Sequence, residues 1–395
     1  MPLRLSASRP PALSAALTSA LVAAGCGLSG CGAGESTDDH HRHPAINAPI
    51  AITHPGGISL LDGQSLAPAD EAPLDGYHRL HPAGDDRHLL VTADDGFRVL
   101  DAAHGDWSDT TFPAAEPGHV IRHAGRTALF ADGTGEVTTF DPRRLADGTP
   151  PTASYTTAAP HHGAAVELPD GGLIVTLGTT ETRTGIAILD RDHRERARNE
   201  DCPGVHGEST VQGDTVVFGC QNGALLVGPD RAITKIASPT PYGRIGTQAA
   251  GPTSPIALGD YKQDEDAELE RPHQVSLIDT RTHTLRLADI GTSYSSHSLA
   301  RGPHGEALIL GTDGGLHVLD PTTGTRQRTI PVTAPWEEPL QSQKPRPTLF
   351  ARGTDAYVSD PATRTIHRVD LTTGTIAATV TLPDVPNELS GVDAE

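Results

Sequence analysis

The chain has 395 residues, of which 50 are acidic and 30 basic, so its formal net charge at pH 7 is −20. A protein with this large negative charge is not expected to bind nucleic acid or an anionic membrane surface, because like charges repel. The 42 glycines, 33 prolines and 4% aromatic residues are typical of many short strands joined by turns. Twenty histidines in an acidic protein favour a function that handles cations.

Residues 1–30 are predicted to be a signal peptide of the lipoprotein type. Two arginines precede the apolar stretch 12–24, which is too short for a stable transmembrane span. The following Leu28-Ser29-Gly30-Cys31 resembles a bacterial lipobox, which implies cleavage before Cys31 and lipidation of that cysteine; a weaker lipobox ends at Cys26. The alternative is a plain signal peptide followed by an incidental cysteine. We therefore expect an exported protein that is either periplasmic or anchored to the cell membrane only through Cys31.

Residues 31–48 are predicted to be a disordered tether, because they are polar and lack apolar periodicity. The tether contains His41 and His43, an HxH pair preceded by acidic residues that could chelate zinc weakly. An inert charged linker is the alternative. From residue 49 to residue 395, short apolar runs broken by Gly, Asp and Pro indicate strands with closely spaced turns.

A repeat of about 38 to 46 residues runs through this region. Its clearest part is a strand that ends in Asp and is followed by a turn. This part recurs at residues 96–101, 136–141, 186–190, 275–279, 316–320 and 366–370. Since each repeat supplies about four strands, the sequence predicts an all-β fold that forms a single β-propeller.

Seven full repeats begin near residues 78, 119, 162, 206, 244, 297 and 346. The segment 50–70 has the pattern of three more strands without an innermost one, and residues 386–394 could supply the missing strand. We therefore predict eight blades, one of them built from both ends of the domain. Seven blades are the alternative, with 50–70 extending an outer edge. Closure matters because open strand edges invite aggregation.

Five histidines precede an apolar strand at a similar distance in five repeats. They are His78, His119, His162, His206 and His297. Innermost strands line the axis of a propeller, so these residues should converge there, and tetrahedral zinc takes three or four such ligands. His119, His162 and His206 belong to successive repeats and should form the most compact trio. His161, Glu208 and an aspartate near the channel mouth are candidates for the fourth ligand or for the groups behind the ligands.

The alternative is that these histidines merely fill a polar, hydrated channel. The other histidines of the strands and turns are predicted to lie on outer strands or at the surface. They are His54, His88, His104, His193, His273, His283, His304, His317 and His367.

After the predicted processing, Cys202 and Cys220 are the cysteines that remain in the body of the protein, beyond the lipidated Cys31. In an oxidising compartment we expect them to form a disulfide, which would hold the loop that carries His206. A zinc thiolate pair is the alternative, although no second CxxC-type pair supports it. P-loop, GxSxG and HExxH motifs are absent and no GxGxxG follows a predicted strand, so signs of an enzyme are few.

Four segments together resemble AztD-type zinc metallochaperones: Pro117-Gly118-His119, Pro160-His161-His162-Gly163, Cys202 through Glu208, and Phe218-Gly219-Cys220. The HxH pair is similar to the histidine-bearing N-terminus of that family. The resemblance implies an extracytoplasmic propeller that binds Zn²⁺ and passes it to the solute-binding protein of a zinc ABC transporter. The lipobox departs from the soluble periplasmic members.

The predicted function is therefore that of a monomeric zinc-binding metallochaperone without catalytic turnover, which delivers zinc to a solute-binding protein by ligand exchange. One alternative is a secreted propeller enzyme, lactonase- or lyase-like, with a metal in its central channel. Another is a scaffold propeller that binds protein or glycan without a metal.

Overall fold

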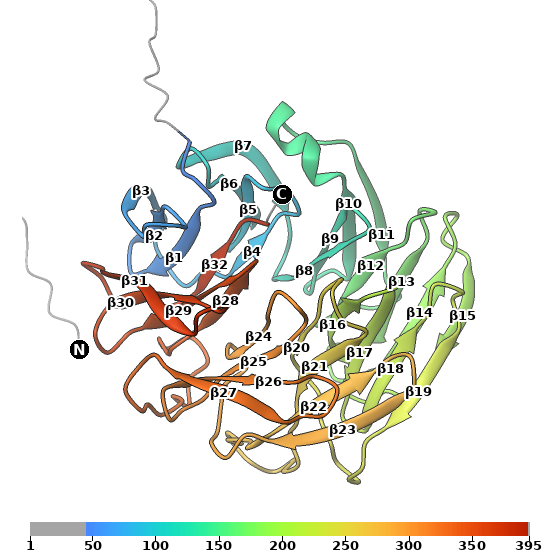
Figure 1. Ribbon diagram of the computed structural model, residues 1–395. Helices are drawn as coiled ribbons and strands as arrows, with labels where there is room; N and C mark the ends of the chain where they lie inside the picture. Colours follow the sequence, from blue (N-terminus) through green and yellow to red (C-terminus); the bar gives the residue numbers. More distant parts are fainter. Residues whose placement is uncertain (1–44, 394–395) are drawn as a thin grey trace, which may run out of the picture. The chain divides into compact units, whose positions relative to one another are not determined.

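The computed structural model of the protein describes residues 45–393. Within them, 32 strands form eight four-stranded antiparallel sheets, the blades of a β-propeller (Figure 1). The helix of this part of the chain is the 3₁₀ helix η1 (Pro142–Asp147), which Asp141 caps by accepting from the Arg143 amide. The predictions for Cys31, His41 and His43 lie outside the described residues.

The first four blades occupy the N-terminal half of the propeller. Blade 1 contains β1 (Ile50–His54), β2 (Gly57–Leu61), β3 (Pro68–Pro73) and β32 (Leu389–Gly391). Blade 2 contains β4 (Leu80–Pro82), β5 (His88–Ala93), β6 (Gly96–Asp101) and β7 (Asp106–Pro113). Blade 3 contains β8 (Pro117–His123), β9 (Arg126–Ala131), β10 (Glu136–Phe140) and β11 (Thr152–Thr156). Blade 4 contains β12 (Ala165–Glu167), β13 (Leu173–Gly178), β14 (Arg183–Leu189) and β15 (Glu195–Asn199).

The other four blades follow in chain order. Blade 5 contains β16 (His206–Val211), β17 (Thr215–Cys220), β18 (Gly223–Val227) and β19 (Ile233–Ala237). Blade 6 contains β20 (Gln248–Ala249), β21 (Ile256–Asp260), β22 (Gln274–Asp279) and β23 (Thr284–Asp289). Blade 7 contains β24 (Leu299–Arg301), β25 (Ala307–Leu310), β26 (Gly315–Leu319) and β27 (Arg326–Pro331). Blade 8 contains β28 (Leu349–Arg352), β29 (Asp355–Asp360), β30 (Thr365–Asp370) and β31 (Thr375–Thr381).

The first strand of each of blades 2–8 is the innermost one. These strands contact their counterparts in neighbouring blades around the ring, as β8 does with β12 and β16 with β20. Blade 1 lacks an inner strand of its own, and β32 takes that place by pairing with β1, with Ile50 opposite Gly391. Figure 1 shows the red β32 beside the blue strands of blade 1. The predicted eight blades with a shared closing blade are confirmed, and the alternative of seven is wrong.

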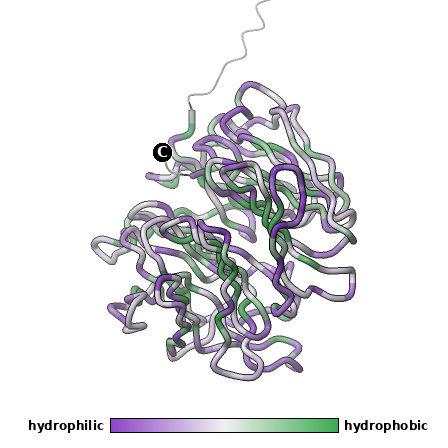
Figure 2. The backbone as a smooth tube through the Cα atoms, turned by 90° about the vertical axis from the view of Figure 1, so that its right-hand side faces the viewer, coloured by the Kyte–Doolittle hydropathy of each residue, from purple (hydrophilic) through white to green (hydrophobic). Residues whose placement is uncertain are grey.

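The core lies between the blades, where the middle strands are covered on both faces. Leu89, Leu90 and Val91 in β5 are all fully buried, which explains why the middle strands are continuous apolar runs rather than alternating ones. The outermost strands alternate instead, as in β31. Figure 2 shows the hydrophobic stretches inside the propeller and hydrophilic ones in many of the connecting loops. Among residues 45–393, no helix is long and apolar enough to cross a membrane.

Two features differ from what the sequence suggests. His88 and His317 are buried rather than on the surface, because each lies on a middle strand and pairs with a nearby aspartate, Asp85 at 2.6 Å and Asp313 at 3.1 Å. Residues 45–48, assigned to the tether from their polarity, lie against the propeller. The Ile46 amide donates to the Ala103 carbonyl at 2.7 Å, and its side chain packs on the core of blades 1 and 2.

Candidate metal centre

Three of the five register histidines meet at the end of the ring where the inner strands begin. His119 is in β8, His162 lies three residues before β12, and His206 is the first residue of β16. They come from consecutive blades. Their candidate ligand atoms lie within 4.8 Å of one another, and this is the one group of three or more possible ligands found within residues 45–393.

The spacing of the histidine trio, His119, His162 and His206, suits a transition metal. Nε2 of His162 lies 3.0 Å from Nε2 of His206 and 3.4 Å from Nε2 of His119. Tetrahedral zinc with bonds of 2.0–2.1 Å places its nitrogen ligands about 3.3 Å apart. The rings lean toward one another, with centroids 5.0 to 5.3 Å apart. The trio therefore has nearly the geometry of one face of a zinc tetrahedron.

Local irregularities in two inner strands aim these side chains. The pairing of β8 with β9 shifts register between Pro117 and Val120, and that of β16 with β17 shifts between His206 and Glu208. Such bulges turn a side chain out of the regular alternation of a strand. Gly207 has φ +69° in the second bulge, and a Cβ there would lie 2.6 Å from the Gly246 carbonyl oxygen. The glycine therefore permits the bend that presents His206.

Two members of the trio, His162 and His206, have an acceptor hydrogen-bonded to their Nδ1 atom. Nδ1 of His162 donates to Oδ2 of Asp132 at 2.5 Å, and Nδ1 of His206 donates to the Gly246 carbonyl at 2.6 Å. Oε2 of Glu208 lies 3.6 Å from Nδ1 of His119. An acceptor behind a histidine ligand fixes the tautomer and raises the basicity of the ligating nitrogen. Asp132 thus takes the role expected for an aspartate near the channel mouth.

These hydrogen bonds leave the inward nitrogens as lone-pair donors. Because Asp132 and the Gly246 carbonyl can only accept, Nδ1 carries the proton in both His162 and His206. In the neutral rings the two Nε2 lone pairs then face each other across 3.0 Å. Two acceptors at that distance repel unless a cation lies between them. The donor set therefore fits zinc.

Burial keeps two of the ligands, His119 and His206, neutral. Burial lowers the pKa of His206 to about 3, and burial together with the neighbouring His206 and His162 lowers the pKa of His119 well below its usual range. Burial also raises the pKa of Glu208 to about 8. The trio is still reachable from solvent, because the His162 side chain is 37% exposed. Neutral imidazoles at a partly open position can both bind a metal and give it up.

The other predicted site histidines lie elsewhere. Both ring nitrogens of His78 face carbonyl oxygens, of Thr92 and Asp75, each at 2.8 Å. His161 points into blade 4, where Nδ1 donates to the Ala159 carbonyl and Nε2 bonds to the Thr176 hydroxyl, both at 2.9 Å. His297 lies in blade 7 with Nδ1 3.8 Å from Glu388. The structure does not bring these three into the trio.

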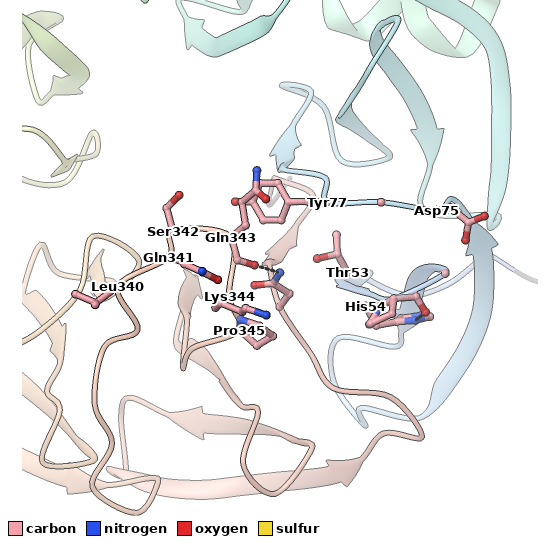
Figure 3. Close-up of a pocket in the computed structure, with 14 residues that line it drawn as sticks. Thr53, His54, Asp75, Tyr77, Leu340, Gln341, Ser342, Gln343, Lys344 and Pro345 are labelled. Carbon is pink, nitrogen blue, oxygen red and sulfur yellow. Dashed lines mark hydrogen bonds between the residues drawn. The ribbon is translucent and has the colours of Figure 1, made fainter. Parts of the chain in front are cut away.

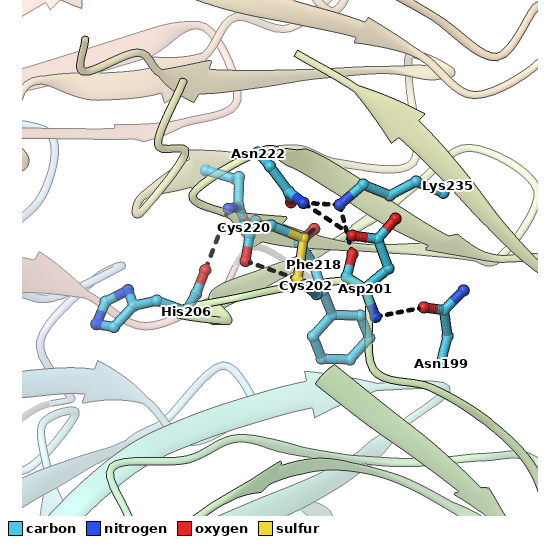
Figure 4. Close-up of a disulfide and its surroundings, with 10 residues drawn as sticks. Asn199, Asp201, Cys202, His206, Phe218, Cys220, Asn222 and Lys235 are labelled. Carbon is cyan, nitrogen blue, oxygen red and sulfur yellow. Dashed lines mark hydrogen bonds between the residues drawn. A yellow bond between two sulfur atoms is a disulfide. The ribbon is translucent and has the colours of Figure 1, made fainter. Parts of the chain in front are cut away.

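The predicted disulfide between Cys202 and Cys220 is present. Figure 4 shows it beside the start of β16, with the His206 ring pointing away from the two sulfurs. Both cysteines are fully buried and pack with Val205 in the core of blades 4 and 5. The bridge fixes the 202–206 segment to β17, so a zinc thiolate pair at these cysteines is ruled out in this oxidised form.

A cavity of about 920 Å³ opens at the same end of the ring as the trio. Residues 53–56, 75–77, 340–345 and 387 line it, in blades 1 and 2 and in the loop before blade 8 (Figure 3). None of the trio, Asp132 or Glu208 borders this cavity. A substrate-sized space and the candidate metal site are therefore separate.

Sequence reasoning missed several residues around the trio. Asp132 follows β9 and Gly246 precedes β20, and each is at least 30 residues from the histidine that it supports. The one signal for Asp132 was its place in an Asp-Gly turn of the repeat. His81, a partly buried inner-strand residue whose Nε2 is buried without a hydrogen-bond partner, was also not singled out.

Fold and site together define an eight-bladed β-propeller with a three-histidine cluster at one end of its ring axis. No protein-family model matches the sequence. The chain is similar to the zinc chaperone AztD of Citrobacter koseri, with 24% identity over 358 residues that cover 84% of this chain and 80% of that protein.

Solved structures agree on the fold. Apo AztD from Citrobacter koseri superposes with a TM-score of 0.76 at 20% identity, covering 87% of this chain and 96% of that one. The dihydro-heme d1 dehydrogenase NirN matches with a TM-score of 0.57 at 12% identity, over 88% of this chain and 75% of that one. These likenesses show a shared propeller architecture. The curated relative is named a chaperone rather than an enzyme.

Proposed function

We propose that this protein is an exported zinc metallochaperone that passes zinc to the solute-binding protein of a zinc ABC transporter by ligand exchange. The observation that carries the proposal is the trio, whose Nε2 atoms converge while acceptors hold Nδ1 of His162 and of His206. The similarity to a zinc chaperone over most of the chain supports the same function.

The mechanism follows from a site that holds zinc with three neutral ligands and is partly exposed. His119, His162 and His206 bind the ion, while Asp132 and the Gly246 carbonyl hold the rings of His162 and His206 in the binding orientation. A three-histidine set leaves a fourth position of tetrahedral zinc for an incoming ligand. Zinc leaves when ligands of the receiving protein replace the histidines one after another. His41 and His43, predicted from sequence to chelate zinc weakly, are proposed to assist this transfer.

The enzyme alternative gains no support from this geometry. A metal-dependent enzyme needs its substrate pocket beside the metal. The cavity of about 920 Å³ is instead lined by residues of blades 1 and 2 and of the loop before blade 8. The scaffold alternative gives no reason for three histidine lone pairs to face one another.

The test is the zinc content of purified protein, followed by a competition titration and a transfer assay. We expect one tightly bound zinc per chain and its movement to the cognate solute-binding protein faster than to a dilute chelator. Protein that binds no zinc would refute the proposal. If zinc is bound but never transferred, the delivery step is refuted and the protein would be a zinc-storage protein instead.

A further inference from the structure

We propose that Arg183 and Arg244 form a carboxylate-binding subsite beside the histidine trio, which draws an acidic ligand of the incoming zinc acceptor toward the metal. This inference rests on the proposed function and names the chemistry of the receiving group. It is carried by the position of the two arginines, their lack of acidic partners and the charge of the loaded site.

Both arginines lie at the end of the ring where the trio lies. Arg183 opens β14, and its carbonyl accepts from the Gly204 amide at 2.8 Å, next to the disulfide-bound segment that leads into His206. Arg244 precedes Gly246, whose carbonyl holds His206. A Cβ built on Gly246 would lie 2.6 Å from Nη1 of Arg244, so this guanidinium folds back over the backbone that supports the site.

The arginine pair, Arg183 and Arg244, is close enough for one charge to act on the other. Burial lowers the pKa of Arg183, and the charge of Arg244 adds to this. Two like charges held near one another in a half-buried position are unfavourable without an anion between or beside them.

Neither arginine has an acidic partner in the described part of the chain. No ion pair within 4.0 Å involves Arg183 or Arg244 among residues 45–393, and Nη1 of Arg183 is buried without a hydrogen-bond partner. Asp132 and Asp260, whose charges act on this pair, are engaged elsewhere. Asp132 accepts from His162, while Asp260 accepts from the amides of Gly246 and Thr247.

The chemistry of the missing partner follows from the charge of the loaded site. Three neutral imidazoles leave the full +2 charge on zinc, and the arginine pair adds two more positive charges in a chain whose net charge is −20. A carboxylate satisfies both groups, because it ligates zinc and also fits the fork of a guanidinium. A carboxylate drawn to the arginines would therefore enter the fourth position of the metal.

The experiment compares zinc release from the loaded full chain to two chelators. Nitrilotriacetate offers carboxylates, whereas an uncharged pyridine-based chelator offers none. The test variant is R183Q/R244Q. The matched control is R191Q/R286Q, which removes two exposed arginines that form no ion pair in the described residues and lie away from the trio.

We expect R183Q/R244Q to release zinc to nitrilotriacetate about tenfold more slowly than the wild type, because electrostatic attraction of the incoming ligand is lost. Release to the uncharged chelator and equilibrium zinc affinity should stay within threefold. Only the nitrilotriacetate rate of the wild type should fall as salt is raised. The control variant should behave as the wild type does.

Three results would overturn the inference. One is an unchanged nitrilotriacetate rate in R183Q/R244Q, and another is an equal slowing with both chelators, which would mean that the arginines only support the site. The third is acceleration of release to the uncharged chelator by free acetate, which would make the pair a general anion site. Absence of zinc binding by the wild-type protein would refute the proposed function as well. This outcome is therefore distinguishable from the three results above.

Discussion

Histidines occupy equivalent repeat positions around one end of the ring, the end where the inner strands begin. On the two sides of this end they make different contacts. In blades 3, 4 and 5, His119, His162 and His206 keep their Nε2 atoms free and turned toward one another. In blade 2, both ring nitrogens of His78 face carbonyl oxygens, and in blade 7 His297 lies near Glu388. Equal register brings a histidine to the axis, but the groups around it decide whether a lone pair remains for a metal.

The largest effect should come from removing the trio. The triple variant H119A/H162A/H206A should lose stoichiometric zinc binding, because no ligand set remains. H78Q and H297Q on the other side should keep the wild-type affinity within twofold. Competition titration measures all three, with circular dichroism to confirm that the fold is intact. Tight zinc binding by the triple variant would place the metal elsewhere.

The disulfide belongs to the trio side alone. In the chain-entropy model a bridge across this span contributes roughly 3 kcal/mol, so C202S/C220S should lower the free energy of unfolding by about that amount. Denaturant titration measures the change. A reductant should lower the stability of the wild type and leave the double variant unaffected. Two alkylatable thiols in natively exported protein would contradict the bridge.

Asp132 tests whether the groups behind the ligands matter. Loss of such a partner typically costs 10- to 100-fold in metal affinity, and we expect D132A to fall in that range. D313A is the matched control, because Asp313 also pairs with a histidine, His317, but in blade 7. Equal zinc affinity in D132A and the wild type would show that His162 binds without help from its carboxylate.

The last prediction concerns the effect of acid on stability. Burial lowers the pKa of His206 to about 3, while an unfolded histidine titrates near 6.5. In the folded apo protein His206 therefore stays neutral. Its contribution to the free energy of unfolding should be complete above about pH 6.5 and should be lost as the pH drops toward 3. The slope is at most about 1.4 kcal/mol per pH unit for each such histidine. H206Q should flatten the dependence seen in denaturant titrations, and an unchanged slope would contradict the depressed pKa.

The lowered pKa also bears on zinc release. Ordinary histidine ligands lose a metal as they are protonated between about pH 7 and 5. Protons compete with zinc for His206 only in more acidic solution, so protonation of this ligand should contribute little to zinc release in mild acid. This favours ligand exchange over protonation as the route of transfer.

The blade pattern could be predicted because each repeat carries its own evidence. Strand-Asp-turn units such as Gly315–Leu319 with Asp320, and the apolar runs before them, are local signals that recur along the chain. The closing strand β32 was also predictable, since blade 1 showed three strands where the others showed four. The trio followed from the register of the histidines within those repeats.

The rest depends on contacts between blades, which no local pattern shows. Asp132 reaches His162 from the neighbouring blade, and the bulge at Gly207 depends on the approach of Gly246. The burial of His317 likewise arises because blades cover both faces of β26. His78 has the same register as His119, yet its ring lies between two carbonyl oxygens, of Asp75 before β4 and of Thr92 in β5.

The closing blade determines the order in which the parts of the propeller can be completed. Among the described residues β32 is the last strand and pairs with β1, the first, so the ring stays open until the segment that carries β32 has been made. The inner edge of β1 is unpaired throughout that interval, and such an edge can pair with other chains. Blades 3 to 5, with the trio and the disulfide, are complete more than 140 residues earlier, since β19 ends at Ala237 and β32 begins at Leu389. The blades that carry the trio can thus form before the propeller has closed.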